Sequence, residues 1–447
     1  MNLRFLQDQR IVVLILFFLA LVVRLVWMLY LMPPLQKIQG WDQDDWAYVK
    51  ATSFFITWIK QGRLEITPEL QFNMGHPMLA KMLFAVGVYC LKTYVGGMVA
   101  AKIVSAVIGS VGTIATYFLG RLVFRRSSSA FGLAVSVSFS SAFFEATTRA
   151  LLDGISVTFL VISLVFLLRC RLTRVVEKNL ILSGLFLGLG LASKLMAVIG
   201  AIVNSCYIAV NGRLHPSRRF ASIVVLGIVA ASIFILVQPR MWIDPVTRLY
   251  ETVGSDAGHL ARGHLIPVSS LPGGDHLWRG SRTSPPPWTI LYWIVSTASP
   301  FTLIAMVLAC LSFRKISSEM KNPVVRISLT SFLIPAIFLS IQTVKLPQYL
   351  TFVVPGMALV ALLGYNARLN RMNRLVIPLS MTTILDPIEQ AILGYYVFLY
   401  PIWLRFLQWG LMLLIIACVI FFGKFESSMW VHGSLKPVKY PKNEPQK

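Results

Sequence analysis

The chain has 447 residues, of which 56% are hydrophobic and only 13% are charged. A soluble domain carries about 25% charged residues, so this composition excludes a soluble globular protein. The net charge of +23 arises from 41 Lys and Arg against 18 Asp and Glu, and the basic residues recur in short clusters between apolar runs. Such clusters mark the cytoplasmic ends of membrane helices. We interpret them in that way rather than as a surface that binds nucleic acid.

The first predicted element is an apolar span over residues 11–32, which is long enough to cross a bilayer. Arg4 and Arg10 precede it and predict a cytoplasmic N-terminus. The next segment, residues 33–77, is then the first external loop. Within it, residues 51–60 can form an amphipathic helix on the membrane surface, with aromatic side chains among the lipid headgroups. We therefore predict a large first external loop that carries juxtamembrane helices.

Further apolar runs alternate with basic clusters along the chain. We interpret residues 78–95 as a short or interfacial helix, because a full crossing there would place the cluster that begins at Arg121 outside. The remaining predicted crossings are 98–120, 128–147, 150–168, a hairpin over 180–211, 220–238, 289–312, 325–343, 349–366, 375–400 and 403–423. With the first span they amount to about 12 crossings of an all-α polytopic membrane protein. The polar break from Asp386 to Glu389 indicates that the helix over 375–400 is broken.

A second long polar segment, residues 239–288, is also predicted to be external. Its Gly and Pro clusters, at residues 272–274 and 285–287, predict partly irregular structure. We take residues 1–424 as one membrane domain and residues 425–447 as a basic cytoplasmic tail. The five cysteines are scattered in or beside apolar segments without metal-ligand spacing. The sequence therefore predicts neither disulfides nor a zinc site.

This topology collects polar side chains from distant segments on the external face. They are Asp44, Asp45, His76, Lys81, Arg149, Asp153, Lys194, Lys345, Gln348 and Tyr349. Ionisable residues at a membrane are costly, so they are functional candidates by default. A cation there can stabilise a phosphate leaving group, and a carboxylate can take a proton from a hydroxyl. The set is therefore suited to chemistry on an anionic, lipid-linked substrate.

Each of these features also has a purely structural interpretation. Lys194 and Lys345 could be snorkelling lysines at helix ends. Arg149 and Asp153, four residues apart, could form a local ion pair on one helix. The His-Pro pair at residues 76–77 could simply begin a helix. We interpret as helix-packing residues the three glycines of the hairpin, Gly184, Gly188 and Gly190.

Taken in chain order, the motifs resemble those of protein O-mannosyltransferases and their bacterial and archaeal relatives. Residues 44–48 (Asp-Asp-Trp-Ala-Tyr) and 76–81 (His-Pro-Met-Leu-Ala-Lys) are similar to that family's Asp-Glu and His-Pro-Pro-Leu-Gly-Lys motifs. Residues 149–153 (Arg-Ala-Leu-Leu-Asp) resemble its Arg-x-x-Leu-Leu-Asp motif, and residues 188–194 resemble its Gly-Leu-Ala-x-x-x-Lys hairpin. Weaker likeness follows at two later segments, 284–293 and 346–355. The resemblance covers roughly residues 1–365.

The resemblance implies a GT-C glycosyltransferase fold. Such enzymes transfer a sugar, here mannose or another hexose or pentose, from a polyprenyl or dolichyl phosphate to an acceptor hydroxyl on the external or lumenal face. It implies Asp44 as the base that activates the acceptor. Asp45, which stands where the family usually has Glu, and Asp153 complete the implied catalytic group. No metal ligands are predicted, and a divalent metal at Asp45 is left open.

The resemblance also implies two groups of binding residues. The donor phosphate is expected at Lys102, Arg149, Lys194 and Lys345. Contacts to the acceptor and its loops are expected at Tyr48, His76, Gln348 and Tyr349. Lys102 falls where relatives often have Arg, and a lysine is a point charge rather than a bidentate fork.

The acceptor is left open between a protein and a glycolipid, because residues 239–288 are too short for the lumenal sugar-binding-like domain of the eukaryotic enzymes. The enzyme would lie in the plasma membrane of a prokaryote or in the endoplasmic reticulum of a eukaryote. The alternatives are a polytopic transporter or lipid flippase, and a same-fold enzyme that modifies lipid A or another glycolipid. A transporter would show midplane charges and paired repeats. The acids lie at the external boundary and no repeat is apparent, so we favour the enzyme.

Overall fold

The computed structural model describes residues 8–31, 43–61, 76–124, 126–170, 177–210, 215–262, 290–291, 294, 298–318, 322–341, 347–368, 376–384 and 410. The chain divides into two compact units, residues 1–401 and 402–447. All described residues except Gly410 belong to the first unit. Every regular element among them is a helix, which confirms the all-α prediction.

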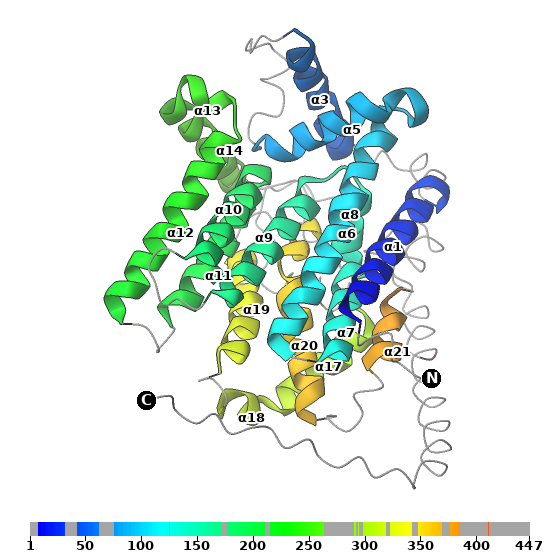
Figure 1. The fold of residues 1–447 in the computed structure, drawn as a ribbon, viewed down its shortest axis with the longest axis vertical. Helices are drawn as coiled ribbons and strands as arrows, with labels where there is room; N and C mark the ends of the chain where they lie inside the picture. Colours follow the sequence, from blue (N-terminus) through cyan, green and yellow to red (C-terminus); the bar gives the residue numbers. More distant parts are fainter. Residues whose placement is uncertain are drawn as a thin grey trace. The chain divides into compact units, whose positions relative to one another are not determined.

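Figure 1 shows how the helices are arranged. Their bounds are α1 Gln9–Val26, η2 Trp27–Leu31, α3 Gln43–Gln61, α5 Leu79–Val95, α6 Gly97–Phe124, α7 Ser127–Ser138, α8 Ser141–Thr148, α9 Leu152–Arg169, α10 Lys178–Ser193, η3 Leu195–Ala197, α11 Val198–Ala209, α12 Pro216–Leu236, α13 Arg240–Ile243, α14 Pro245–Arg262, α17 Pro300–Leu311, α18 Phe313–Ser318, α19 Pro323–Ile341, η5 Pro347–Phe352, α20 Val354–Arg368, α21 Val376–Met381 and η7 Thr382–Ile384.

Four of the described helices are long and apolar enough to cross a membrane: α1 continued into η2, α6, α9 and α12. They coincide with the predicted crossings that begin at residues 11, 98, 150 and 220. The shorter apolar helices α10, α11, α17, α19 and α20 lie in further predicted crossings. The total of about 12 crossings stays a prediction, because residues 263–289 and 385–409 lie outside the described part of the chain.

The predicted crossing over residues 128–147 is not one straight helix. It consists of α7 and α8, which are bent by 62° at a break over residues 139 and 140. Four serines, at positions 136, 138, 140 and 141, surround the break, and serine side chains compete with the backbone ladder of a helix. Membrane helices tolerate such breaks only where other groups satisfy the freed backbone atoms.

One prediction about the polar loops needs correction. Residues 51–60 are helical, as predicted, but their aromatic side chains are not all available to the lipid headgroups, because Phe55 is only 3% exposed and packs in a buried hydrophobic cluster with residues of α5. In the segment 239–288, the helices α13 and α14 extend as far as Arg262, and the Gly and Pro clusters that predicted partly irregular structure lie outside the described residues.

A glycine separates α5 from α6. Gly96 ends α5 with a φ of +82°, a left-handed conformation that side chains with a Cβ disfavour. The chain can therefore turn sharply and begin α6 at the next residue, so that α5 packs back against α6. In Figure 1, α3 and α5 lie together at the upper end of α6.

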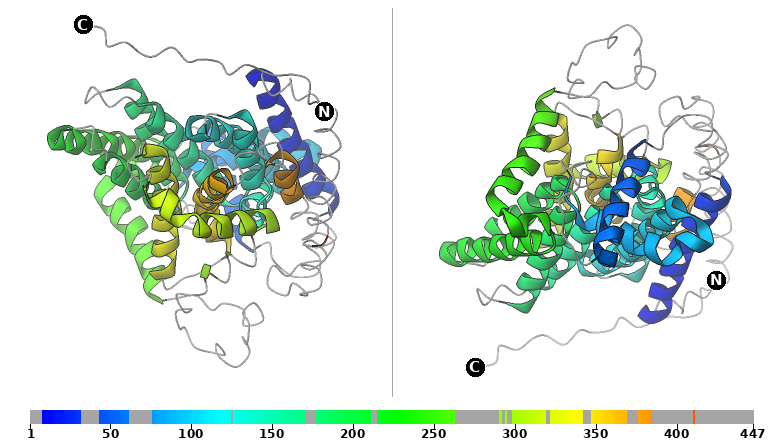
Figure 2. Two further views of the ribbon diagram at one scale, coloured as in Figure 1. Left: turned by 90° about the horizontal axis from the view of Figure 1, so that it is seen from below. Right: turned by 90° about the horizontal axis from the view of Figure 1, so that it is seen from above.

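The glycines of α10 pack against neighbouring helices, as the sequence predicted. A methyl group on Gly188 would lie 2.5 Å from the carbonyl oxygen of Ala230 in α12, and one on Gly184 would lie 2.9 Å from Val229. Gly190 instead faces Ser156 and Leu160 of α9. The two views of Figure 2 show the crowded helices of this unit from below and above, with α1 and α12 at opposite sides of the helices between them.

Candidate functional site

The connection between α8 and α9 carries a charged residue at each end. Arg149 follows the last residue of α8, and Asp153 is the second residue of α9. The three residues between them, Ala150, Leu151 and Leu152, are at most 1% exposed. Burial of this apolar centre fixes the segment, so its two charged ends have defined directions.

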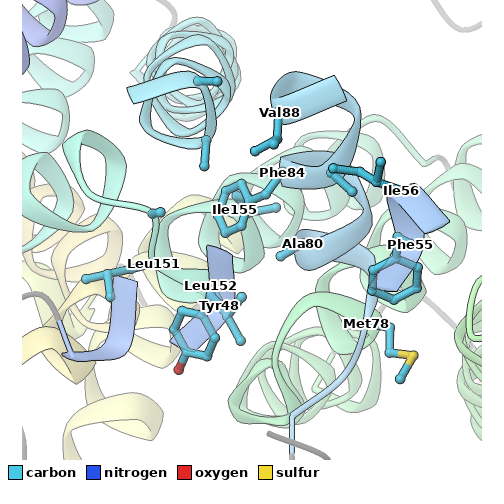
Figure 3. Close-up of a cluster of buried hydrophobic side chains, with 14 residues drawn as sticks. Tyr48, Phe55, Ile56, Met78, Ala80, Phe84, Val88, Leu151, Leu152 and Ile155 are labelled. Atoms are coloured by element: carbon cyan, nitrogen blue, oxygen red, sulfur yellow. The ribbon is translucent and has the colours of Figure 1, made fainter. Parts of the chain in front are cut away.

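A hydrophobic cluster joins this connection to the first loop. It contains Tyr48 of α3, Met78 before α5 and Leu151 and Leu152 of the α8–α9 connection, among other residues. Figure 3 shows Tyr48 beside Leu152, with Phe84 of α5 close to Ile155 of α9. The cluster therefore brings the motifs at residues 44–48, 76–81 and 149–153 to one place.

At the first end of the connection, four charged side chains meet, and we call Asp45, Lys102, Glu145 and Arg149 the Arg149 group. The Nε and Nη2 atoms of Arg149 both lie 3.2 Å from Asp45 Oδ1, and its Nη1 donates to Glu145 Oε1 at 2.9 Å. Lys102 Nζ lies 3.7 Å from the other Asp45 oxygen. Asp45 is fully buried. The group holds two cations and two carboxylates, so it is neutral as a whole.

Electrostatics favours the charged form of Arg149. Burial opposes its charge, but the neighbouring carboxylates of Asp45 and Glu145 outweigh that effect and raise the pKa of the guanidinium above its ordinary value. Arg149 is therefore a permanent cation. It ties the first turn of α3 to the end of α8, although Asp45 and Arg149 are 104 residues apart in the chain.

At the second end of the connection lies a smaller set, Asp153, Lys194 and Tyr349, which we call the Asp153 group. Lys194 Nζ lies 2.6 Å from both carboxylate oxygens of Asp153, and both side chains are buried. The same ammonium lies 4.8 Å from the centre of the Tyr349 ring, within the range of a cation–π contact. Lys194 stands directly after α10, so this pair ties α10 to the start of α9.

Three more of the predicted residues lie beside these groups. The rings of Tyr48 and His76 contact each other edge to face, with their centres 5.9 Å apart. Lys81 is 2% exposed and donates to the backbone carbonyl of His76 at 3.1 Å. A further hydrogen bond, from Thr351 of η5 to the carbonyl of Ala142 in α8, connects the segment that carries Tyr349 with the helix that ends at Arg149.

These contacts decide two of the structural alternatives. Lys194 is 3% exposed and bound to Asp153, so it is not a snorkelling lysine. Arg149 and Asp153 are not a pair on one helix, because Arg149 ends α8 and contacts Asp45 and Glu145, whereas Asp153 belongs to α9 and binds Lys194.

Part of the predicted site lies beyond what the structure describes. Asp44 belongs to the first turn of α3 and Gln348 to η5, but their side chains are outside the described set. Lys345 is outside it altogether. The roles predicted for these residues stay predictions.

Sequence reasoning missed Glu145 and Arg24. Glu145 lies inside the apolar run 128–147, yet it is the second carboxylate bound to Arg149. Arg24 lies inside the first apolar span and is fully buried. A charged residue within a membrane span is a functional candidate whatever the motif around it. That single rule would have found both.

Among the described residues, no cluster of three or more His, Cys, Asp or Glu side chains could hold a metal ion. The carboxylates of the site are instead bound by Arg and Lys side chains.

Two comparisons with known proteins agree with this arrangement. Residues 75–242 match the model of the dolichyl-phosphate-mannose-protein mannosyltransferase family. This stretch contains His76, Lys102, Arg149, Asp153 and Lys194. No curated protein sequence matches the chain.

The fold is similar to that of solved membrane glycosyltransferases. ArnT from Cupriavidus metallidurans bound to undecaprenyl phosphate is 14% identical, with a TM-score of 0.54 over 85% of this chain and 70% of that one. The archaeal oligosaccharyltransferase AglB from Archaeoglobus fulgidus, in complex with an inhibitory peptide and a dolichol-phosphate, is 13% identical, with a TM-score of 0.50 over 85% of this chain and 55% of that one. The chain has a GT-C fold. Its matched stretch is mannosyltransferase-like.

This similarity confirms the fold class predicted from the sequence. The match over residues 75–242 agrees with the predicted family resemblance. The chain spans only 55% of the length of AglB. Its apolar helices and the family match indicate a multi-pass membrane protein.

Proposed function

We propose that this GT-C protein transfers a sugar from a polyprenyl phosphate to the hydroxyl group of an acceptor, at the site where α3, α5 and the α8–α9 connection meet. One observation carries the proposal. The motifs that resemble the mannosyltransferase family, although spread over residues 44–194, converge on this connection through the Arg149 and Asp153 groups.

The proposed reaction is a single displacement. The acceptor oxygen forms a bond to the anomeric carbon of the sugar, while the bond from that carbon to the phosphate oxygen breaks. The phosphate leaves with the electron pair, and the hydroxyl proton passes to a carboxylate. We assign this base to Asp44, because a hydroxyl is a poor nucleophile at neutral pH until a positioned carboxylate accepts its proton.

Asp45 has a different proposed role. Its carboxylate is already bound by Arg149 and approached by Lys102, and Asp45 itself is fully buried. It therefore serves to hold the first turn of α3 against α8. Because Asp44 precedes it in the same turn, fixing Asp45 also fixes the backbone from which the proposed base projects.

The phosphate of the donor is proposed to bind near Lys194 and Arg149, the cations at the two ends of the connection. Cations aimed at a developing phosphate charge act strongly where water is excluded. Both cations are neutralised by carboxylates in this structure. To bind phosphate, Lys194 and Arg149 must each donate hydrogen bonds to the carboxylate and to the phosphate at the same time. Both side chains have several N–H groups, so this is possible.

The identity of the sugar and the acceptor belongs to the same proposal. The partial match to a mannosyltransferase family favours mannose. The two similar structures were solved with undecaprenyl phosphate and with a dolichol-phosphate, which supports a polyprenyl phosphate as the carrier. A glycolipid and a protein are both retained as acceptors.

The direct test is transfer of labelled sugar by the purified protein. The protein is incubated with a panel of radiolabelled polyprenyl-phosphate sugars and with membrane extract as acceptor. We expect release of polyprenyl phosphate and transfer of label from the mannosyl donor. If no donor is consumed while the protein accelerates movement of the labelled lipid between vesicle leaflets, the flippase alternative is correct.

We propose that the site faces the outside of the membrane. Single cysteines at positions 60 in α3 and 216 at the start of α12, in a variant that lacks the native cysteines, test this orientation. An impermeant thiol reagent added to intact cells is expected to label position 60 and to spare position 216. The reverse pattern would place the site on the cytoplasmic face.

A further inference from the structure

An arginine lies buried inside the first candidate membrane span. Arg24 belongs to α1, is 0% exposed, and is among the largest fully buried side chains of the described residues. An ionised side chain in a membrane helix is expensive unless the protein interior supplies partners. The partners of Arg24 therefore indicate what it does.

Arg24 binds the place where α7 breaks and α8 begins. Its Nη2 donates to the carbonyl oxygen of Ser138 at 3.0 Å, and its Nη1 to the hydroxyl of Ser138 at 3.1 Å. Its Nε donates to the hydroxyl of Thr147 in α8 at 2.8 Å. The guanidinium also lies 5.8 Å and 5.4 Å from the ring centres of Phe143 and Phe144. One planar side chain thus contacts both sides of the bend.

The bend needs such a partner. Ser138 is the last residue of α7, so its carbonyl has no place in the hydrogen-bond ladder of that helix. Next to it, the Val137 carbonyl accepts from Ser140. The Ser138 carbonyl accepts from Arg24. A buried carbonyl without a donor would favour a straight helix over the bend.

The direction of α8 decides whether the site can form. Thr147, which Arg24 holds, lies between Glu145 of α8 and Arg149, which directly follows α8. Arg149 in turn reaches Asp45 on α3. We propose that Arg24 is a positioning residue that locks the α7–α8 bend and so aims α8 at the first turn of α3. The proposal rests on contacts alone and holds whichever sugar is transferred.

Hydrogen exchange followed by mass spectrometry, on the full chain in lipid nanodiscs, tests this role. In Arg24→Met we expect exchange to become about tenfold faster in α8 and in the first half of α3. Of these two segments, Arg24 contacts only α8, through Thr147 and the rings of Phe143 and Phe144. Exchange over residues 178–236 is expected to stay unchanged. In Arg24→Lys we expect the same pattern, since one ammonium cannot replace a planar fork that reaches Ser138 and Thr147 together.

Arg169→Met is the matched control, because Arg169 is an exposed arginine whose guanidinium lies 5.6 Å from the ring centre of Phe118. It should leave α8 and α3 unchanged. If Arg24→Met does not yield monodisperse protein, Thr147→Val decides, since it removes one acceptor of Arg24 and keeps the shape. Unchanged exchange in α8 and α3, or a rise that extends equally over residues 178–236, would overturn the proposal. Exchange in Arg24→Lys equal to that of the unmodified protein would also overturn it, because a positive charge alone would then be enough to hold the bend.

Discussion

The two ends of the α8–α9 connection are built differently. At the Asp153 end, one carboxylate and one ammonium form a closed pair, with both oxygens of Asp153 at 2.6 Å from Lys194. At the Arg149 end, four charges from α3, α6 and α8 share contacts of 2.9 to 3.7 Å. Asp45 Oδ2 is buried there without a hydrogen-bond partner among the described residues.

This structural difference suggests that the Asp153 group and the Arg149 group have different roles. A closed pair holds two helices together and leaves little freedom for a ligand, apart from the remaining donors of Lys194. The Arg149 group is larger and looser, because Asp45 Oδ2 is approached only by Lys102 at 3.7 Å and Glu145 is 24% exposed at its edge. Its contacts can therefore rearrange more easily than the closed pair of Lys194 and Asp153. We infer that the Arg149 group changes most when substrate binds.

Removing Arg149 should have the largest effect on stability. Arg149→Met leaves Asp45 buried without its main partner, and the loss of one member of a buried pair costs about 3–5 kcal/mol. We expect a strong fall in the thermal unfolding midpoint of the purified protein. The matched control is Arg248→Met, because Arg248 pairs with Glu251 at 2.7 Å in a much more exposed place. A similar midpoint for the two variants would show that the Arg149 group is not a structural centre.

Substitutions of Lys194 and Asp153 should show whether this pair binds the donor phosphate or only holds α9 and α10 together. If Lys194 contacts the donor phosphate, Lys194→Met should weaken the binding of undecaprenyl phosphate by about tenfold or more, the worth of a charge-assisted hydrogen bond. Asp153→Asn releases the ammonium from its carboxylate and should leave this affinity equal or higher. Titration of both variants with the lipid, followed by intrinsic fluorescence, measures the difference. Equal losses in the two variants would make the pair a helix clamp only.

Glu145→Gln should have the smallest effect. The side chain is partly exposed, the amide oxygen can still accept from Arg149, and an ion pair screened by solvent contributes less than about 1 kcal/mol. We expect an unfolding midpoint within error of the unmodified protein. A loss as large as that of Arg149→Met would mean that Glu145, rather than Asp45, is the main partner of the guanidinium.

The all-α fold class and the proximity of several candidate residues could be predicted from the sequence. Continuous apolar runs predicted the helices, and the predicted topology collected Asp45, Arg149, Asp153 and Lys194 on one face. Which cation binds which carboxylate could not be predicted. Arg149 pairs with Asp45 across 104 residues because the break between α7 and α8 turns it toward α3.

Sequence periodicity does not reveal that break, because residues 128–147 are predominantly apolar on both sides of it. The serines at positions 136, 138, 140 and 141 were the available signal, and a charged residue within an apolar run was the signal for Arg24 and Glu145. Residues 51–60 are a second example of a feature that the sequence pattern alone could not decide. An amphipathic pattern predicts a helix with one apolar face, but whether lipid or protein covers that face depends on tertiary packing.

The measurement that tests the central claim most directly is the initial rate of sugar transfer by Asp44→Asn at saturating donor. The substitution keeps the size and most hydrogen bonding of the side chain but removes its basicity. We predict a rate lower by about 10²–10⁴-fold with donor binding nearly unchanged. The control is Asp42→Asn, at the aspartate two residues before Asp44 in the sequence, and we predict a far smaller loss for it. Both variants are first shown to be monodisperse in detergent. A rate for Asp44→Asn within a few-fold of the unmodified protein would contradict the assignment of the base to the first turn of α3.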